Sequence, residues 1–488
     1  MTNGSTTGGV RACPAGTGLR RSPDPHQLAF GARFVAAVSA GSVLNPINSS
    51  IIAVAMVSIG QAFGVGADTT TWLVSALYLA TAVGQPTMGR LADLFGPRRV
   101  YLAGLGLVAT GGLLGFCAPS LGVLVGARVV IGLGTSAAYP AAIALLRLRS
   151  ERVGRPPPGG VLGALAVAGQ ASMAIGPPLG GLLLAIGGWR SVFVVNLPLA
   201  VLGAALALRW LPADKQVGHW RWRQMWHTLD PLGLGLFVLA MTSLLVFLVD
   251  VTELRWSLLA AAAVATLALI VRELRAATPF LNVRMLAGNR PLVATYVRYM
   301  VTFLITYCVV YGWTQWLEQS AGYSASGAGL LLMPSFVVAA VASALIARRN
   351  HVRAPLVTGA GVLLAVSVSL LSLTASSSLW SLLCVSAAFG LQNGLLVVAN
   401  QAAMYTKAPA DQIGVAAGLL RTFMYLGAML SASLIGVAFG SGASDAGLHR
   451  LAVVLTVASA LLLVSTLVSG NLPRSGDRSA HHPQAHKH

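Results

Sequence analysis

The sequence predicts an all-α integral membrane protein with about fourteen transmembrane helices, and three observations support this fold class. Of the 488 residues, 56% are hydrophobic, only 9% are charged, and the mean hydropathy is +0.76. Long apolar runs recur along the chain, and the Lys and Arg residues cluster between them. A soluble domain carries about a quarter of its residues as charged side chains. So few charges cannot cover a water-facing surface, so lipid must solvate most of this chain.

The apolar runs are about 17–25 residues long, which is sufficient to cross a bilayer. They lie at 30–57, 70–90, 98–117, 120–146, 160–186, 190–210, 231–249, 256–272, 291–317, 326–347, 354–375, 378–405, 412–439 and 448–470. An even number of crossings places both termini on the same side of the membrane.

The distribution of cationic residues predicts the orientation. With both termini inside, the inner side holds 26 of the 32 Lys and Arg residues, whereas the outer side keeps Arg190, Arg255 and Arg450. Cationic residues favour the cytoplasmic side of membrane proteins. We therefore expect a multi-pass protein of the cell membrane with both termini cytoplasmic. The net charge of +19 follows this topology and does not indicate nucleic-acid binding.

The first six and the last six predicted spans resemble each other in length and in loop spacing. This similarity predicts two pseudo-symmetric six-helix halves around a central two-helix hairpin. Such repeats are typical of secondary transporters, whose site lies between the halves near the membrane midplane. The predicted segments are a disordered cytoplasmic tail (1–29), an N-terminal six-helix half (30–210), a basic cytoplasmic linker (211–229), the hairpin (230–275), a C-terminal six-helix half (276–470) and a His-containing cytoplasmic tail (471–488). No Cys spacing or in-span His cluster indicates a metal site, although the histidines of the last tail leave a metal-binding role open as an alternative.

The loop after the second predicted span reads GRLADLFGPRR and is a candidate gating loop. Gly89 and Gly96 permit a tight turn. Asp93 can accept hydrogen bonds from a helix N-terminus, or from Arg98 and Arg99 across the halves. A charged contact of this kind would hold one access state closed. The alternative interpretation is an ordinary basic loop.

The fifth predicted span is rich in small residues, which let a helix pack tightly against a partner, and its prolines bend it. The residues concerned are Gly163, Gly169, Gly176, Pro177, Gly180 and Gly181. The fourth span contains a further segment, RVVIGLG, which begins at Arg128.

In this order and at these spans, the segments resemble the major facilitator superfamily, and most closely its fourteen-span drug:proton antiporter group of multidrug and antibiotic efflux type. The gating loop resembles the superfamily pattern GxxxD(R/K)xG(R)(R/K). The Arg128 segment resembles the RxxQGxG element, with Ile131 in place of Gln, and the Gly/Pro-rich span resembles an element of exporters. The resemblance covers roughly residues 30–470. It implies alternating access driven by a proton gradient, with no cofactor.

The sequence departs from this group where cation exporters carry an acid in the first span, because Asn48 stands there. Asn can neither exchange a proton near neutral pH nor neutralise a cation. No acid lies in the middle of any span, whereas Arg128, Arg298 and Arg421 are embedded in spans. A charge at such depth normally faces a cavity or a partner, although each Arg could instead extend to the interface or bond a helix-end carbonyl. We therefore expect neutral or anionic amphipathic substrates.

The candidate substrate and coupling residues share polar or aromatic side chains within or beside the spans. They are Asn48, Tyr78, Arg128, Tyr139, Arg298, Trp313, Gln315, Glu318, Asn400, Gln401 and Arg421. Asn45, Gln85, Gln170, Tyr311, Gln392 and Asn393 could line the same cavity. Each could instead form an ordinary helix–helix hydrogen bond. If protons couple to transport, Glu318 or Asp93 must titrate, or the substrate must carry the proton.

Our leading hypothesis is a secondary-active exporter that works as a monomer on a small-molecule substrate in the lipid bilayer. The main alternative is an uptake permease or facilitator for an anionic or polar metabolite. A membrane-embedded enzyme is a remote alternative, because the spans contain no nucleophile–base pair and no cluster of His and acids.

Overall fold

The computed structural model describes residue 4 and residues 30–468, apart from 66–69, 71, 155–158, 215–229, 250–254, 277–278, 282, 324, 348–351 and 441. The predictions for the two tails and for most of the linker 211–229 therefore lie outside the described residues.

All regular secondary structure in the described residues is helical. The helices are α2 (Ala32–Ser42), α3 (Leu44–Phe63), α5 (Trp72–Phe95), α6 (Pro97–Phe116), α7 (Leu121–Ser136), α8 (Ala138–Val153), α9 (Gly159–Val194), α10 (Asn196–Trp210), α12 (Pro231–Val249), α13 (Trp256–Arg275), α14 (Val283–Gly288), α15 (Arg290–Tyr307), α16 (Thr314–Gln319), α17 (Ala325–Ala347), α18 (Arg353–Ser369), α19 (Leu379–Lys407), α20 (Ile413–Phe439) and α21 (Asp445–Val468). A π-helical segment, η1 (Cys308–Trp313), joins α15 to α16.

Eleven helices in the described part of the chain are long and apolar enough to cross a membrane, or twelve if one bent pair counts as a single span. The all-helical membrane fold is confirmed, whereas the number fourteen stays a prediction. The two further predicted crossings fall on α5 and on the first part of α9, which are helical but are not among those candidates. The helix of α9 is interrupted at Gly187 and Gly188, where the backbone leaves helical geometry and Gly188 has a φ of 65°.

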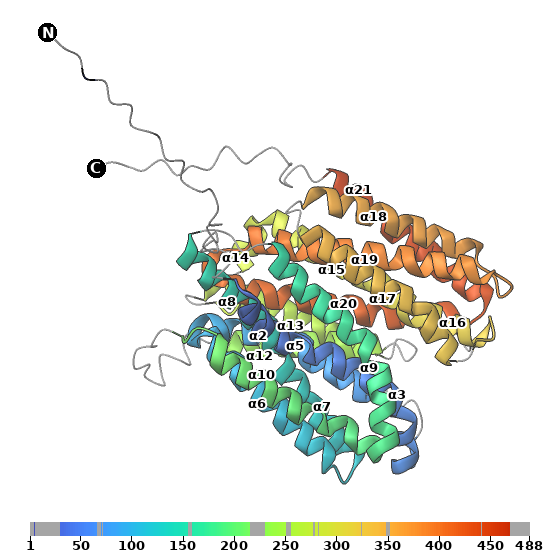
Figure 1. Ribbon diagram of the computed structural model, residues 1–488, viewed down its shortest axis with the longest axis horizontal. Coiled ribbons are helices and arrows are strands. Elements are labelled where there is room, and N and C mark those ends of the chain that lie inside the picture. Colours follow the sequence, from blue (N-terminus) through green and yellow to red (C-terminus); the bar gives the residue numbers. More distant parts are fainter. Residues whose placement is uncertain are drawn as a thin grey trace.

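The helices form two groups, which we name the N-terminal bundle (α2–α10) and the C-terminal bundle (α15–α21). Figure 1 shows the blue-to-green N-terminal helices at the lower left and the gold-to-red C-terminal helices at the upper right. The bundles meet where α5 packs against α20 and where α9 packs against α17. Helices α12 and α13 pack on each other, and α12 also contacts α5 and α20. The central hairpin therefore lies beside one of the two seams between the bundles.

Small residues set the helix spacing inside the N-terminal bundle. Gly134 of α7 faces α6 so closely that a Cβ atom there would lie 2.7 Å from the oxygen of Gly104 and from the nitrogen of Val108. Without a hydrophobic driving force in lipid, such close backbone packing supplies much of the helix association.

Gly134→Ala is therefore expected to destabilise the protein by about 1–3 kcal/mol, since overpacking a tight contact has this cost. Gly126→Ala is the matched control on the same helix, because a Cβ at Gly126 meets no atom within 4 Å. This control should leave stability unchanged or raise it by up to about 1 kcal/mol, through the better helix propensity of Ala. Thermal unfolding in detergent measures both variants, and equal stability of the two would contradict the packing.

Candidate functional site

The bundles are joined at one end by a carboxylate and a helix terminus. We call this end, which holds Gly96, Arg98 and Arg99, the basic end. Near it, the carboxylate of Asp93 on α5 accepts hydrogen bonds from the backbone N–H groups of Gly414 and Val415, each at 3.2 Å. These N–H groups belong to the first turn of α20, where they have no partner within the helix and where the helix dipole is positive. The contact is therefore a charged cap made by one bundle on a helix of the other.

Glycine makes this approach possible. A Cβ atom at Gly89 would overlap the backbone of Gly414 on α20, and a Cβ at Gly163 of α9 would overlap the side-chain Cβ of Ala347 on α17. Both seams between the bundles are therefore tightly packed toward the basic end.

Arg98 and Arg99 do not contact Asp93, so the helix N-terminus is the partner that the structure gives Asp93. Instead, their backbone N–H groups donate to the carboxylate of Asp214, at 3.1 and 2.8 Å, and the Arg98 guanidinium donates to the oxygen of Leu208 at 2.7 Å. Asp214 thus caps the start of α6 from within its own bundle. Asp214 was not among the residues predicted from the sequence, where its only signal is an acid within a basic linker.

A cavity of about 80 Å³ lies between the bundles. Its lining comes from α3, α9, α15, η1, α17, α19 and α20, and no carboxylate belongs to that lining as described. The polar and aromatic members include Asn45, Ser49, Tyr299, Phe303, Thr306, Tyr307, Phe389, Asn393, Gln401 and Arg421. This space holds about two or three water molecules, whereas drug-sized ligands occupy about 300–1,000 Å³. The bundles must therefore move apart to admit a substrate of that size.

Arg421 places a positive charge against this cavity. Its guanidinium carbon lies 4.1 Å from the ring centroid of Tyr139, which is a cation–π geometry. Its Nη1 donates to the sulfur of Met424 at 3.5 Å, and its Nε has no hydrogen-bond partner among the described residues. Tyr299 and Tyr307, two neighbouring tyrosines that the sequence analysis did not single out, also line the cavity. A cation held by aromatic rings keeps donors available for an anionic or polar group.

The other embedded arginines lie elsewhere. Arg128 is buried, and its Nε and Nη2 donate to the backbone oxygens of Leu73 at 2.9 Å and Asn48 at 3.2 Å, so it ties α7 to α5 and α3 and does not line the cavity. Arg298 is buried in the C-terminal bundle, where its Nη2 donates to Thr295 at 3.1 Å and its Nε lies 3.5 Å from Asn400 Oδ1.

Asn48 lies outside the cavity lining as well, inside the N-terminal bundle. Its Nδ2 donates to Asn196 Oδ1 at 2.7 Å and to the oxygen of Leu44 at 2.9 Å. Asn45, nearly one turn earlier, is the cavity residue, and its Oδ1 accepts from the Tyr425 hydroxyl at 2.7 Å.

Among the remaining candidates, Gln401 lines the cavity, and its Nε2 lies 3.5 Å from the Tyr299 hydroxyl. The hydroxyl of Tyr78 lies 3.3 Å from that of Tyr311, which links α5 to η1 of the other bundle. Trp313 is buried in the C-terminal core, whereas Gln315 and Glu318 are exposed on α16.

The Gly/Pro-rich helix divides its glycines between packing and the cavity. Gly169 lines the cavity, Gly176 and Gly180 approach Ser50 and Ile51 of α3, and a Cβ at Gly181 would meet no atom within 4 Å. Pro177 lies within α9. The functional roles of all these residues stay predictions.

Asn48→Asp should destabilise the protein by about 1–3 kcal/mol, because the carboxylate cannot donate and would face two buried acceptors. Asn45→Asp is the matched variant. The neighbours of Asn45 Nδ2 are the hydroxyls of Thr81 and Thr135, which can reverse and donate. Asn45→Asp should therefore fold and add a negative charge to the cavity. Thermal unfolding of the two variants, and the resistance of cells that express them to cationic compounds, test this prediction. If Asn48→Asp alone gained such resistance, the positions assigned to Asn45 and Asn48 would be contradicted.

The sequence model described as Major Facilitator Superfamily matches residues 38–432. The protein named "Uncharacterized MFS-type transporter YwoD" from Bacillus subtilis is 32% identical over 436 residues, which cover 88% of this chain and 95% of that one. The tetracenomycin C resistance and export protein of Streptomyces glaucescens is 29% identical over 492 residues, covering 97% and 83% of the two chains.

A solved structure, the human organic anion transporter MFSD10 (TETRAN), is similar in fold, with a TM-score of 0.61, 16% identity, and coverage of 91% of this chain and 99% of that one. The family match covers well over half of the sequence, and the two helical bundles agree with it. This chain therefore belongs to the major facilitator superfamily and is a transporter, not an enzyme.

Proposed function

We propose that this protein is a secondary-active exporter of small amphipathic molecules, neutral or anionic, that works by alternating access as a proton antiporter. It crosses the cell membrane fourteen times with the basic end in the cytoplasm, acts as a monomer and needs no cofactor. The printed names of relatives support export, since they include a tetracenomycin C resistance and export protein, a multidrug resistance protein and methylenomycin A resistance proteins.

The observation that carries the substrate class is Arg421 in a cavity whose described lining contains no carboxylate. Charges interact far more strongly in a low-dielectric interior than in water. A cationic substrate beside Arg421 would be repelled with no acid to neutralise it, whereas an anionic group would gain a charge-assisted hydrogen bond. Tyr299 and Phe303 add aromatic surface for the apolar part of the substrate.

The contact at the basic end supports alternating access. The cap that Asp93 places on α20 holds this end closed, so opening toward the cytoplasm breaks two hydrogen bonds to a charged acceptor. Protonation of Asp93 removes the charge and weakens the cap. We assign proton coupling to this carboxylate, because the other candidate, Glu318, is exposed on α16 and does not line the cavity.

The decisive assay uses inside-out membrane vesicles with a pH gradient, with and without the protein. Neutral or anionic amphiphiles should collapse the gradient in a protein-dependent way, and matched cationic amphiphiles should not. Collapse of the gradient by cationic amphiphiles alone would overturn the proposed substrate class. Substrate accumulation driven by a pH gradient of the opposite direction would favour the uptake alternative.

Arg421→Gln should lower gradient collapse by anionic amphiphiles at least about tenfold, which is the effect of losing roughly 1.4 kcal/mol of binding. Arg421→Lys should retain part of it, because Lys keeps the charge and loses the planar stacking on Tyr139. Equal loss in both variants would show that the positive charge of Arg421 is not what recognises the substrate.

Asp93→Asn should remove about 1 kcal/mol of charge–dipole stabilisation from the state that is closed at the basic end. The ratio of open to closed molecules should therefore rise roughly fivefold. Spin labels at Arg152 and Gln412, in a protein without its native cysteines, would report the distance between the bundles. The matched control is Asp214→Asn, which removes a cap within one bundle and should leave the distance distribution unchanged. An unchanged distribution in Asp93→Asn contradicts the role of the cap.

A further inference from the structure

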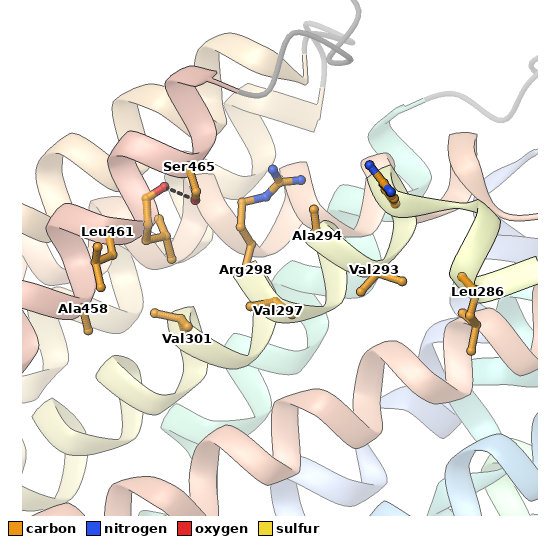
Figure 2. Close-up of a pocket in the computed structure, with 12 residues that line it drawn as sticks. Leu286, Val293, Ala294, Val297, Arg298, Val301, Ala458, Leu461 and Ser465 are labelled. Atoms are coloured by element: carbon orange, nitrogen blue, oxygen red, sulfur yellow. Dashed lines mark hydrogen bonds between the residues drawn. The ribbon is translucent and has the colours of Figure 1, made fainter. Parts of the chain in front are cut away.

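A second and larger recess, of about 680 Å³, lies on the side of the C-terminal bundle. Figure 2 shows that most of its side chains come from two helices, α15 with Val297 and Val301, and α21 with Leu461. Leu286 of α14 also belongs to the lining. The lining is almost entirely apolar, and the two cations in it are Arg290 and Arg298. We call this recess the lateral groove.

The lateral groove opens away from the central cavity. Val297 and Leu461 are exposed, with 42% and 66% of their surfaces accessible. The opposite face of α15 carries Tyr299 and Phe303, which line the central cavity. In a membrane, the groove is therefore reached from the lipid and not from the substrate path.

The charges of the groove gather toward one end. Arg290 is the first residue of α15 and is exposed at the basic end, and Arg298 lies about 12 Å further along the helix at 1.5 Å per residue. The guanidinium of Arg298 lies on the same side of the groove as Ser465, near the end of α21 (Figure 2). Lys407, the last residue of α19, is within electrostatic range of Arg298. Cations near the interface and apolar walls beyond them match an amphiphile with an anionic head.

Arg298 has no anionic partner among the described residues. Only 4% of its surface is exposed, and the hydrogen bonds described for it go to neutral side chains, Thr295 and Asn400. No described carboxylate forms an ion pair with Arg298 or Arg290. A guanidinium carries five N–H donors, so most of those on Arg298 stay available. A buried cation without a counter-ion is costly, and an anion bound there would offset that cost.

We propose that the lateral groove binds an anionic phospholipid of the leaflet at the basic end. The lipid phosphate lies between Arg290 and Arg298, and an acyl chain follows the apolar walls of α15 and α21. Basic pockets between transmembrane helices on the cytoplasmic side are typical sites for anionic headgroups. Because α15 also lines the central cavity, the bound lipid stabilises the helix that carries Tyr299 and Phe303.

The test measures lipid binding to the purified protein by native mass spectrometry and by thermal unfolding in a neutral detergent. The probes are phosphatidylglycerol, phosphatidylcholine with the same acyl chains, and glycerol 3-phosphate. Phosphatidylglycerol should bind at least about tenfold more tightly than phosphatidylcholine and raise the melting temperature. Equal binding of the two lipids would overturn the proposal, and stabilisation by glycerol 3-phosphate alone would replace the lipid with a free phosphate.

Three variants separate the groove from the general positive charge of the protein. Arg290→Gln, at an exposed position, should lower the preference for phosphatidylglycerol over phosphatidylcholine at least about threefold. The double variant Arg290→Gln/Arg298→Gln should lower this preference about tenfold or more. Ala294→Phe fills the groove, keeps both arginines and should also lower it. Arg209→Gln is the matched control, an exposed cation at the end of α10 outside the groove. Loss in Arg209→Gln equal to that in Arg290→Gln would overturn the site.

Discussion

The low dielectric of the membrane interior is the constraint on which this structure depends, and its three embedded arginines meet it in three ways. Arg128 gives its hydrogen bonds to backbone oxygens of two neighbouring helices and so acts as a tie within the N-terminal bundle. Arg421 rests on the ring of Tyr139 beside the central cavity. Arg298 contacts only neutral side chains among the described residues and borders the lateral groove. We propose that the same residue type serves packing, substrate recognition and lipid binding according to its neighbours.

The two bundles touch through contacts that can be broken at low cost. Glycines bring α5 to α20 and α9 to α17, and the Asp93 carboxylate caps α20 across the first seam. Backbone packing at these glycines is tight, and the rings of Tyr78 and Tyr425 lie 5.6 Å apart further along the first seam. A helix cap contributes only about 0.5–2 kcal/mol. A seam built in this way favours two alternative arrangements of rigid bundles over a gradual deformation.

Hydropathy and charge were sufficient to predict the helical membrane fold, because in lipid every backbone group must be satisfied within a helix and cationic residues mark the loops. The sequence also singled out Gly89 and Asp93, which contact α20 across the first seam, and their gating role stays a prediction. Sequence alone could not separate Asn45 from Asn48, which are three residues apart on one helix, because helix rotation decides which of them faces the cavity. Nor could it find Tyr299, Tyr307 or Asp214, whose roles come from partners distant in the chain.

The central claim is that the cavity between the bundles selects against cations because Arg421 has no carboxylate beside it in the described lining. The most direct measurement is calorimetric binding of two amphiphiles with the same aromatic body, one ending in a sulfonate and one in a trimethylammonium group. Using the double variant Arg290→Gln/Arg298→Gln reduces binding of the anionic compound at the lateral groove. We expect the sulfonate to bind at least about tenfold more tightly, and equal or tighter binding of the trimethylammonium compound would contradict the account.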